Sequence, residues 1–333
     1  MNLIRSRAPL RISFGGGGTD ILPYINDSGG AVINATINKY AYGTLIPNNT
    51  SDIVVKSLDL NTTAVYNIDN TYKFGGKLDL VTAVLKNFTP ETGFDLYLHC
   101  DAPPGSGLGS SSTVIVALIC LLKDYLKHSL TDYEIAELAY KLEREDLAMA
   151  GGKQDQYASS FGGFNYIEFN RDSTIVNPLK VPREVLNELE YRSLLVYTGK
   201  TRVSANIIEE SKDRYEGGLS KENLDRTKQI AMEMKNNLLM GDLQNFGNML
   251  NEAWEHKKEF ASAVSNSEID KIVERARNAG AIGCKVTGAG GGGFLYLFCD
   301  FNKKHQVSDE LISLGAKPID FSFELKGAQT WKI

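Results

Sequence analysis

The sequence predicts an α+β protein divided into two domains. Its 333 residues are enough for one large domain or for two, of which we favour two. A stretch rich in strands and hairpins over residues 31–74 is followed by helical patterns, and a second mixture of helices and strands ends the chain. The composition shifts near residues 178–182. We therefore place one domain over residues 1–180 and the other over residues 181–333.

The overall composition excludes several classes of protein. Hydrophobic residues at 42% and charged residues at 23% are ordinary for a soluble globular chain. The net charge of −5, with no long basic run, argues against a general nucleic-acid surface. The longest apolar run, residues 114–122, is far short of the ~20 residues that a membrane helix needs. The N-terminus lacks the apolar core of a signal peptide, so we expect a cytoplasmic protein with neither a nucleic-acid nor a membrane partner.

The cysteines and histidines do not form a metal-binding pattern. The four cysteines are widely spaced without a CxxC pair, and the four histidines are scattered. A zinc site is therefore not expected. Unpaired cysteines within predicted strands and helices are typical of buried thiols in a reducing compartment. These cysteines are Cys100, Cys120, Cys284 and Cys299.

The first candidate site follows the first predicted strand, residues 6–14. Four consecutive glycines, residues 15–18, come directly after it and precede Thr19 and Asp20. Glycines lose more conformational entropy on folding than other residues, so a run of them is costly. Such a run is expected where a ligand must approach the backbone closely. Arg11 before the run and Asp20 after it provide a cation and an anion. The alternative is a flexible hairpin tip with incidental charges.

The second candidate site, residues 103–112, predicts a phosphate-binding loop. A strand pattern precedes it from Phe94, and a continuous apolar run follows it. Two prolines end the strand, three glycines allow a tight turn, and three serines occupy the positions of a helix N-cap. The unpaired N–H groups and positive dipole end of such a helix attract polyanions. The alternative is an ordinary strand-to-helix turn with a serine cap.

Two familiar nucleotide-binding motifs do not fit this loop. A Walker loop ends in Gly-Lys-Ser/Thr, and residues 103–112 contain no lysine. The dinucleotide fingerprint requires a glycine where Ser110 stands. Whatever binds here therefore binds in another way.

The segment after this region carries two candidate carboxylates. A helix is predicted over residues 132–149, with a cap at Thr131 and Glu134 in its first turn, and it contains Glu143. A glycine pair then leads to Lys153 and Asp155. A carboxylate beside an ammonium group stays ionised and can accept a hydroxyl proton. The alternative for Glu143 is a solvated surface charge.

The second half of the chain contributes a charged turn and a third glycine-rich loop. A strand over residues 191–197 leads to Lys200 and Arg202, which could hold an anionic substrate group or form a solvated turn. Helices are predicted between residues 223 and 279. Residues 288–293 satisfy GxGxxG, but a strand follows where a dinucleotide fold requires a helix. A helix over residues 303–314 and a strand over residues 321–325 complete the prediction.

Three of these segments resemble the conserved motifs of the GHMP kinases, which include galactokinase, homoserine kinase and mevalonate kinase. Residues 8–20 resemble the first motif, residues 104–111 are very similar to the second, and residues 288–292 resemble the third. Their order spans nearly the whole chain. The resemblance implies a GHMP kinase two-domain fold, with an N-terminal domain like domain 2 of ribosomal protein S5 and a ferredoxin-like C-terminal domain.

The resemblance also implies roles for the candidate residues, with ATP and Mg²⁺ as cofactors. Asp155 would be the base or the group that orients the acceptor hydroxyl, Arg11 would stabilise the transferring phosphoryl group, and Ser110 and Glu143 would hold Mg²⁺. The residues implied to contact ATP are Pro104, Gly105, Ser106, Gly107, Leu108, Gly109, Ser110, Ser111 and Ser112. The residues assigned to the sugar, by the resemblance or by their charge, are Gly16, Gly17, Gly18, Thr19, Asp20, Lys153, Gln154, Lys200, Arg202, Gly290 and Gly291.

Within the family, the chain resembles the branch that contains heptose 7-phosphate kinases and fucokinase domains. Galactokinases have an acidic residue in the first motif where this chain has glycine, which argues against galactose. Lys153, Lys200 and Arg202 suit a substrate that already bears a phosphate. The resemblance implies phosphorylation of the anomeric hydroxyl of a small-molecule sugar phosphate, a heptose 7-phosphate, to the 1,7-bisphosphate, toward a GDP-activated heptose for surface glycans.

Several alternatives remain open from the sequence. The enzyme could act on fucose or another unphosphorylated sugar, and it could be a monomer or a homodimer. A non-catalytic sensor of ATP and sugar is disfavoured by the intact Glu143, Asp155 and phosphate loop. Diphosphomevalonate decarboxylase is disfavoured by the first motif, which resembles that of sugar kinases.

Overall fold

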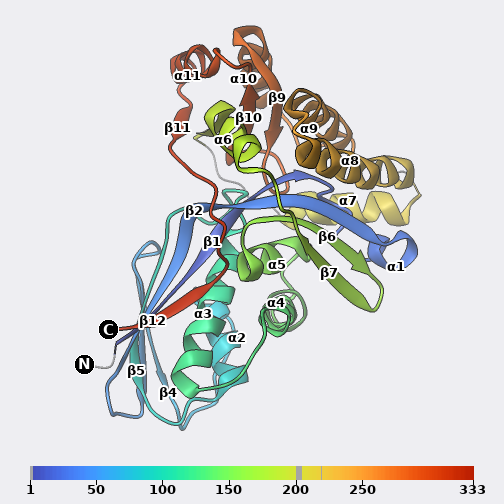
Figure 1. Ribbon diagram of the computed structural model, residues 1–333. Helices are drawn as coiled ribbons and strands as arrows, with labels where there is room; N and C mark the ends of the chain where they lie inside the picture. The colour runs from blue at the N-terminus through green and yellow to red at the C-terminus, as the bar shows by residue number, and fades with distance from the viewer. Residues whose placement is uncertain (1–2, 200–204, 219) are drawn as a thin grey trace.

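The computed structural model describes residues 3–199, 205–218 and 220–333, which form two β-sheets of different size (Figure 1). The larger sheet has eight strands: β1 (Ile4–Gly15), β2 (Gly30–Pro47), β3 (Asp52–Ser57), β4 (Thr62–Asn67), β5 (Phe94–Cys100), β6 (Phe164–Asn170), β7 (Ser173–Pro178) and β12 (Gln329–Lys332). The smaller has four: β8 (Ser193–Tyr197), β9 (Ala281–Val286), β10 (Phe294–Cys299) and β11 (Lys317–Ile319).

The long strand β2 organises the larger sheet. It pairs along its length with β1, while its first half pairs with β6 and its second half with β5. Most β1 and β2 residues are buried, as expected for strands that carry helices on both faces. This arrangement brings the C-terminal end of β1, and the glycine loop after it, into the middle of the molecule.

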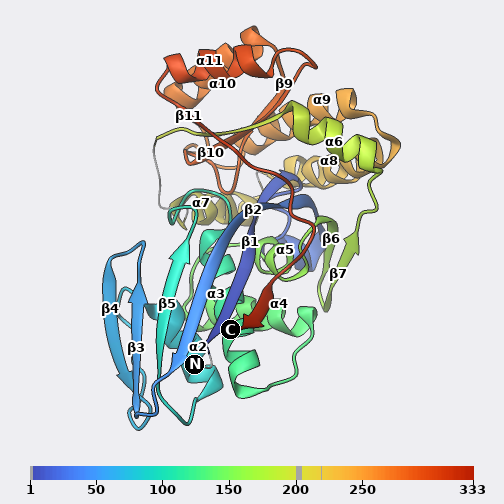
Figure 2. The same cartoon turned by 60° about the vertical axis from the view of Figure 1, so that its left-hand side comes forward.

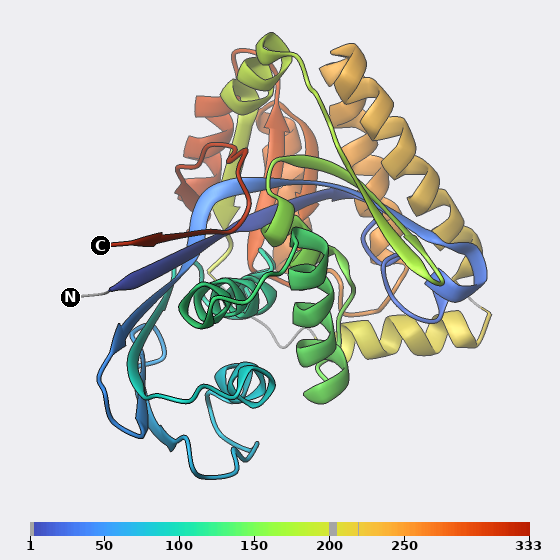
Figure 3. The same ribbon diagram turned by 60° about the horizontal axis from the view of Figure 1, so that its bottom comes forward.

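Helices cover one face of the larger sheet, as Figure 3 shows. The helix α3 packs on β1 and β2 and is apolar almost all round, with residues 115–122 buried. The predicted cap before α4 is confirmed, because the Thr131 hydroxyl accepts the Glu134 N–H at 3.3 Å and Glu134 accepts the Thr131 N–H at 2.7 Å. The elements on this face are α2 (Asp79–Phe88), α3 (Ser110–Leu126), α4 (Asp132–Tyr140), the π-helical turn η1 (Lys141–Asp146) and α5 (Gln154–Phe161).

The smaller sheet confirms the ferredoxin-like prediction. Its antiparallel order is β11-β8-β10-β9, and helices connect β8 to β9 and β10 to β11. That is the order of a β-α-β-β-α-β unit. Its helices α8 and α9 also pack against β1 or β2 on the second face of the larger sheet. The remaining helices are α1 (Tyr24–Ser28), α6 (Arg183–Arg192), α7 (Ala205–Glu216), α8 (Lys221–Met240), α9 (Leu243–Lys258), α10 (Ser267–Ala279) and α11 (Lys304–Ser313).

The end of the chain differs from the prediction. Residues 321–325 do not form the expected strand; Phe323 makes a single bridge to Ile37, and its ring packs 4.7 Å from that of Phe164. The pairing with β2 there is short: the Ser322 carbonyl accepts the Asn38 N–H and the Glu324 N–H donates to the Thr36 carbonyl, both at 2.9 Å. The chain then returns to the larger sheet as β12, which pairs with β1 (Figure 2). The boundary proposed after residue 180 therefore separates β12 from the sheet to which it belongs.

None of the helices in the described part of the chain combines the length and hydropathy needed to cross a bilayer.

Candidate active site

A cleft of about 950 Å³ lies where the three glycine-rich segments meet. Its walls include Gly17 and Gly18 of the first segment, most of the loop before α3, and Gly288 of the third. The helix α7 and the end of α9 complete the lining from the second half of the chain. Its volume is within the usual range for cofactor and substrate sites.

The loop before α3 lines this cleft and turns tightly at its glycines. Gly105, Gly107 and Gly109 all have positive φ, at 73°, 84° and 77°. The N-cap of α3 is Gly109 with no side-chain cap bond, so the expected serine cap is wrong and the serines form the first helical turn instead. The N–H groups of that first turn have no partner within the helix and can bind an anion.

Most of the residues predicted to contact ATP line the cleft. They are Pro104, Gly105, Gly107, Gly109, Ser110, Ser111 and Ser112. Ser106 and Leu108 are buried beneath the loop instead. The Leu108 carbonyl accepts the Arg11 N–H at 3.1 Å, which ties the loop to β1.

Arg11, which is buried, and Asp155, which is partly exposed, form an ion pair beside this loop. Arg11 Nε and Nη2 both approach Asp155 Oδ1, at 2.7 and 2.6 Å, and Nη1 donates to the Gly107 carbonyl at 2.7 Å. A Cβ at Gly109 would lie 3.2 Å from Asp155 Oδ2. The guanidinium therefore leaves Oδ2 uncommitted and close to the N-terminus of α3.

Glu143 is the centre of a second buried network. Its Oε2 accepts from Ser112 Oγ at 2.6 Å and from Gln156 Nε2 at 2.7 Å, and its Oε1 lies 3.3 Å from Arg144 Nη1. The π-helical turn η1 carries Glu143 into the interior, where it is 1% exposed. The structure thus excludes the alternative of a solvated surface charge.

The serine that reaches Glu143 is Ser112 rather than Ser110. The Ser110 hydroxyl is directed to the Pro103 carbonyl at 3.4 Å. Glu143 Oε1 and Ser111 Oγ are buried without a hydrogen-bond partner among the described residues, although both residues line the cleft. Oxygen atoms of this kind are suitable ligands for a hard cation such as Mg²⁺.

The first glycine-rich segment holds Asp20 in place. Asp20 is 2% exposed and accepts the N–H groups of Gly18 at 3.0 Å and Gln154 at 3.2 Å. Burial raises the pKa of the Asp20 carboxyl, and the nearby charge of Asp155 raises it further. The Thr19 hydroxyl bonds to backbone atoms of Gly16 and Ala31, so its contacts shape the loop.

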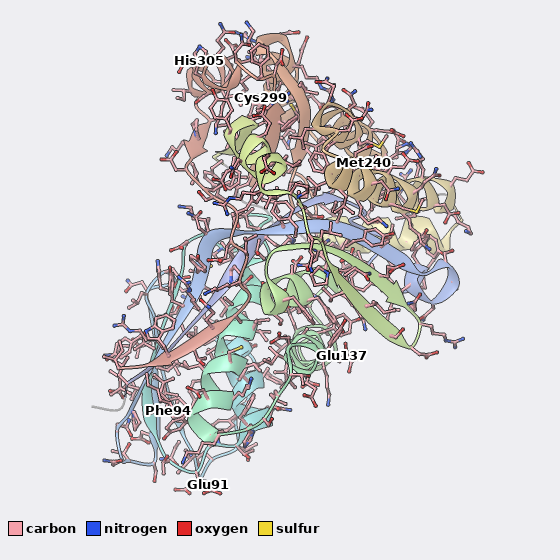
Figure 4. The ribbon with its side chains drawn as sticks, in the orientation of Figure 1. Glu91, Phe94, Glu137, Met240, Cys299 and His305 are labelled. Carbon is pink, nitrogen blue, oxygen red and sulfur yellow. The ribbon has the colours of Figure 1, made fainter. Side chains whose placement is uncertain are left out.

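Several residues predicted to contact the sugar lie elsewhere. Lys153 does not line the cleft; its ammonium is 3.6 Å from Glu137 and 4.5 Å from the ring centre of Tyr140. Figure 4 shows Glu137 on α4. A side chain at the start of a helix projects according to helical phase, which separates it from Asp155 two residues later. Lys200 and Arg202 lie outside the described residues.

The third glycine-rich segment acts mainly as packing for the phosphate loop. The Phe294 N–H donates to the Ser106 carbonyl at 3.0 Å, and a Cβ at Gly293 would lie 2.2 Å from that oxygen. Gly290 and Gly291, predicted to contact the sugar, do not line the cleft and pack against Val264, whose carbonyl accepts the Gly291 N–H at 2.6 Å. Glycine is required here for close approach of two backbones.

Lys257 is a cleft residue that the sequence analysis missed. It lies in the last turn of α9, is 7% exposed, and donates a hydrogen bond to the Gly288 carbonyl. Burial, together with the positive charge of Arg11, lowers the pKa of Lys257 to about 7. No local motif marks it, because a lysine near a helix C-terminus usually lies at the surface.

Comparisons with known proteins identify the family. The profile described as GHMP kinases N terminal domain matches residues 79–163, and that described as GHMP kinases C terminal matches residues 221–317. The chain is 40% identical to the D-glycero-alpha-D-manno-heptose 7-phosphate kinase of Campylobacter jejuni, with 100% of both chains covered. It is also 27% identical to the bifunctional fucokinase/GDP-fucose pyrophosphorylase of Arabidopsis thaliana, over 91% of this chain and 30% of that protein.

A solved structure agrees with these matches. The crystal structure of a D-glycero-D-manno-heptose 1-phosphate kinase from Bacteroides thetaiotaomicron superposes with a TM-score of 0.84 and 36% identity, over 99% of each chain. The sequence match and this structural match both extend over the two domains and the three glycine-rich segments that meet at the cleft. The chain therefore belongs to the GHMP kinase family.

Proposed function

We propose that this protein is an ATP-dependent kinase that phosphorylates the anomeric hydroxyl of D-glycero-D-manno-heptose 7-phosphate, giving the 1,7-bisphosphate. The observation that carries the proposal is the position of Asp155, a carboxylate held by Arg11 next to the N-terminus of α3. The chain matches a heptose 7-phosphate kinase in sequence and a heptose 1-phosphate kinase in structure, each over 99% or more of its length, which supports a sugar kinase of this type. The product would be an early intermediate toward a GDP-activated heptose for surface glycans.

ATP would bind with its phosphates on the loop before α3. Positive φ at alternate glycines turns backbone N–H groups toward the cleft, and the helix dipole adds positive potential there. The cleft continues past Ser57, Leu78 and Leu98, an apolar region suited to a nucleobase. We therefore expect the adenine on that side and the sugar on the side of Asp20.

The residues around Glu143 fit a magnesium ion. Glu143 Oε1 and Ser111 Oγ have unused acceptor capacity, and Ser112, Gln156 and Arg144 hold the Glu143 carboxylate in a fixed orientation. We propose Glu143 as the acidic ligand, with Ser111 or Ser112 as the hydroxyl ligand in place of Ser110. When bound, Mg²⁺ would neutralise charge on the ATP phosphates.

The chain's own residues would carry out the rest of the transfer. Asp20 accepts hydrogen bonds from sugar hydroxyls and orients the ring. The acceptor oxygen forms a bond to the γ-phosphorus as the bond to the β,γ-bridging oxygen breaks, and ADP leaves. The hydroxyl proton passes to Asp155 Oδ2, the oxygen that Arg11 does not bind. Arg11 stabilises the negative charge on the phosphoryl oxygens.

The compartment is part of the same proposal. All four cysteines are unpaired and buried. Burial raises the pKa of each thiol to about 12, so none is reactive in the folded protein. Free thiols and a requirement for ATP both fit a cytoplasmic enzyme.

Release of ADP with Mg²⁺-ATP across a panel of acceptors tests the proposal. The panel contains D-glycero-D-manno-heptose 7-phosphate, the corresponding 1-phosphate, sedoheptulose 7-phosphate, mannose 6-phosphate, fucose and galactose. The 1-phosphate is included because the names of the two heptose relatives specify different phosphate positions. Turnover confined to the 7-phosphate supports the proposal. Turnover only with fucose would instead favour the fucokinase-like alternative, which the Arabidopsis relative motivates.

A further inference from the structure

Lys257 occupies an unusual position for a lysine. Among the described residues, Lys257 and Lys285 are the buried lysines, and of these two only Lys257 lines the cleft. The next residue, Lys258, points outward and pairs with Glu255 at 2.5 Å. The structure therefore places one lysine of this turn at the surface and the other inside the cleft.

The positive charge of the Lys257 ammonium group is only partly balanced by its hydrogen-bond partners. The Gly288 carbonyl accepts from it, and within the described chain it has no ion pair with a carboxylate. Lys285, by contrast, donates to the carbonyls of Ser13 at 3.1 Å and Phe14 at 2.8 Å, where it joins β9 to the end of β1. An ammonium group has three donors, so Lys257 retains donor capacity toward the cleft.

The charges that face Lys257 locate it at the acceptor end of the cleft. Arg11 from β1 and Lys285 from β9 oppose its charge, while Asp20 from the first glycine segment and Asp155 from α5 favour it. Glu143 is not among these groups. The Gly288 position is also close to the phosphate loop, because a Cβ there would lie 2.5 Å from Gly107 Cα.

We propose that Lys257 binds a phosphoryl oxygen between the phosphate loop and the carboxylates of Asp20 and Asp155. This inference rests on the proposed kinase function and gives it a further substrate-contacting cation. A buried ammonium with unused donors is stabilised when an anion binds it. In the proposed reaction, a phosphoryl oxygen is the anion that reaches this position. The oxygen belongs either to the group in transfer from ATP or to the phosphate already on the acceptor.

Three variants separate the charge of Lys257 from its packing. Lys257→Met keeps the length of the side chain and removes the charge, Lys257→Arg keeps a charge, and Lys258→Met is the matched control in the same turn. We expect Lys257→Met to lower kcat/KM about 100-fold or more, as loss of a transition-state donor does, with partial recovery in Lys257→Arg. Lys258→Met should retain the wild-type rate. Thermal unfolding of each variant reports whether the fold is kept.

Calorimetry at pH 8 in buffers of different ionisation enthalpy identifies the phosphoryl source without turnover. Since the pKa of Lys257 is about 7 in the ligand-free protein, an anion that binds it should cause proton uptake that is absent in Lys257→Met. Uptake with a magnesium complex of a non-hydrolysable ATP analogue would identify the transferring group. Uptake with heptose 7-phosphate would identify the acceptor's phosphate.

The proposal and the substrate assignment can fail separately. Wild-type kcat/KM in a folded Lys257→Met, with unchanged proton uptake for both ligands, would overturn the role of Lys257. Absence of binding heat from heptose 7-phosphate would instead contradict the substrate assignment, and the nucleotide titration would still decide the role of Lys257.

Discussion

The guanidinium of Arg11 joins the carboxylate of Asp155 to the phosphate loop. Two of its nitrogens approach Oδ1 at 2.7 and 2.6 Å, and the third donates to the Gly107 carbonyl at 2.7 Å. Because Arg11 is 2% exposed, this arrangement is fixed before any ligand binds. Asp155, the proposed base, and the loop proposed to bind phosphate are thus held at a set separation by a single side chain.

Replacing Asp155 with asparagine should abolish most turnover while nucleotide binding is kept. The amide preserves the shape of the side chain but cannot take the acceptor proton, so we expect kcat to fall roughly 100- to 10,000-fold. Single-turnover kinetics and titration with an ATP analogue measure the two effects. Near-wild-type kcat in this variant would remove Asp155 from the mechanism.

The three serines of α3 offer an internal comparison for the metal site. Ser112→Ala removes the 2.6 Å hydrogen bond to Glu143, so we expect the Mg²⁺ concentration for half-maximal activity to rise about 10-fold or more. Ser110→Ala removes only a 3.4 Å contact with the Pro103 carbonyl and should have little effect. A larger effect from Ser110→Ala than from Ser112→Ala would restore Ser110 as the proposed ligand.

Lys153→Met tests whether the lysine beside the base holds the substrate phosphate. Its ammonium contacts Glu137 and the Tyr140 ring outside the cleft, so we expect the KM for the sugar phosphate to stay within about threefold of wild type. Initial rates at varied sugar phosphate, with saturating Mg²⁺-ATP, measure this. A tenfold rise in KM with unchanged kcat would show that Lys153 reaches the substrate after all.

The buried charge of Lys257 should make stability depend on pH. Its pKa falls from 10.5 in an exposed lysine to about 7 in the folded protein. Below pH 7 both states are protonated and the full destabilisation is present; between pH 7 and 10.5 the folded state holds fewer protons, so stability rises with pH. We expect Lys257→Met to be more stable than wild type at pH 6, by a few kcal/mol in order of magnitude.

Urea unfolding of wild type and Lys257→Met at pH 6 and pH 9 measures this dependence. The advantage of the variant should shrink at pH 9, where the native amine is mostly neutral. An advantage that is equal at both pH values would show that the charge is not the cause, and a variant less stable at pH 6 would indicate a structural role for the Gly288 contact.

The contact between the second and third glycine segments can be tested with alanine. At Gly107, φ is 84° and a Cβ would lie 2.6 Å from the Thr287 carbonyl oxygen; at Gly315, φ is 83° with nothing within 4 Å. Gly315→Ala should therefore cost about 1–2 kcal/mol from backbone strain alone. Gly107→Ala should cost about 1–3 kcal/mol more because a backbone must move. Equal losses in urea unfolding would contradict the close approach.

Much of the site was predictable because its motifs are local. The glycines of the tight turn and the cap before α4 act within a few residues, so the sequence predicts them directly, whereas the serine cap predicted for α3 was wrong. The resemblance linked Arg11, Glu143 and Asp155, and the structure brings all three to one cleft. The strand predicted over residues 321–325 was wrong in extent. The segment pairs with β2 only through the bridge at Phe323 and the backbone hydrogen bonds beside it, and alternation of apolar residues does not state how far pairing extends.

The sequence by itself determined the family, the two-domain α+β class and the glycine- and serine-rich loop proposed to bind phosphate, since these depend on residue order and short-range geometry. The tertiary structure alone decided which charges face the cleft. Lys153 and Lys257 are both lysines at helix ends, yet one pairs with Glu137 outside and the other is buried beside Gly288. The sequence states which side chains can carry a charge, whereas their exposure, their partners and hence their pKa depend on segments far away in the chain.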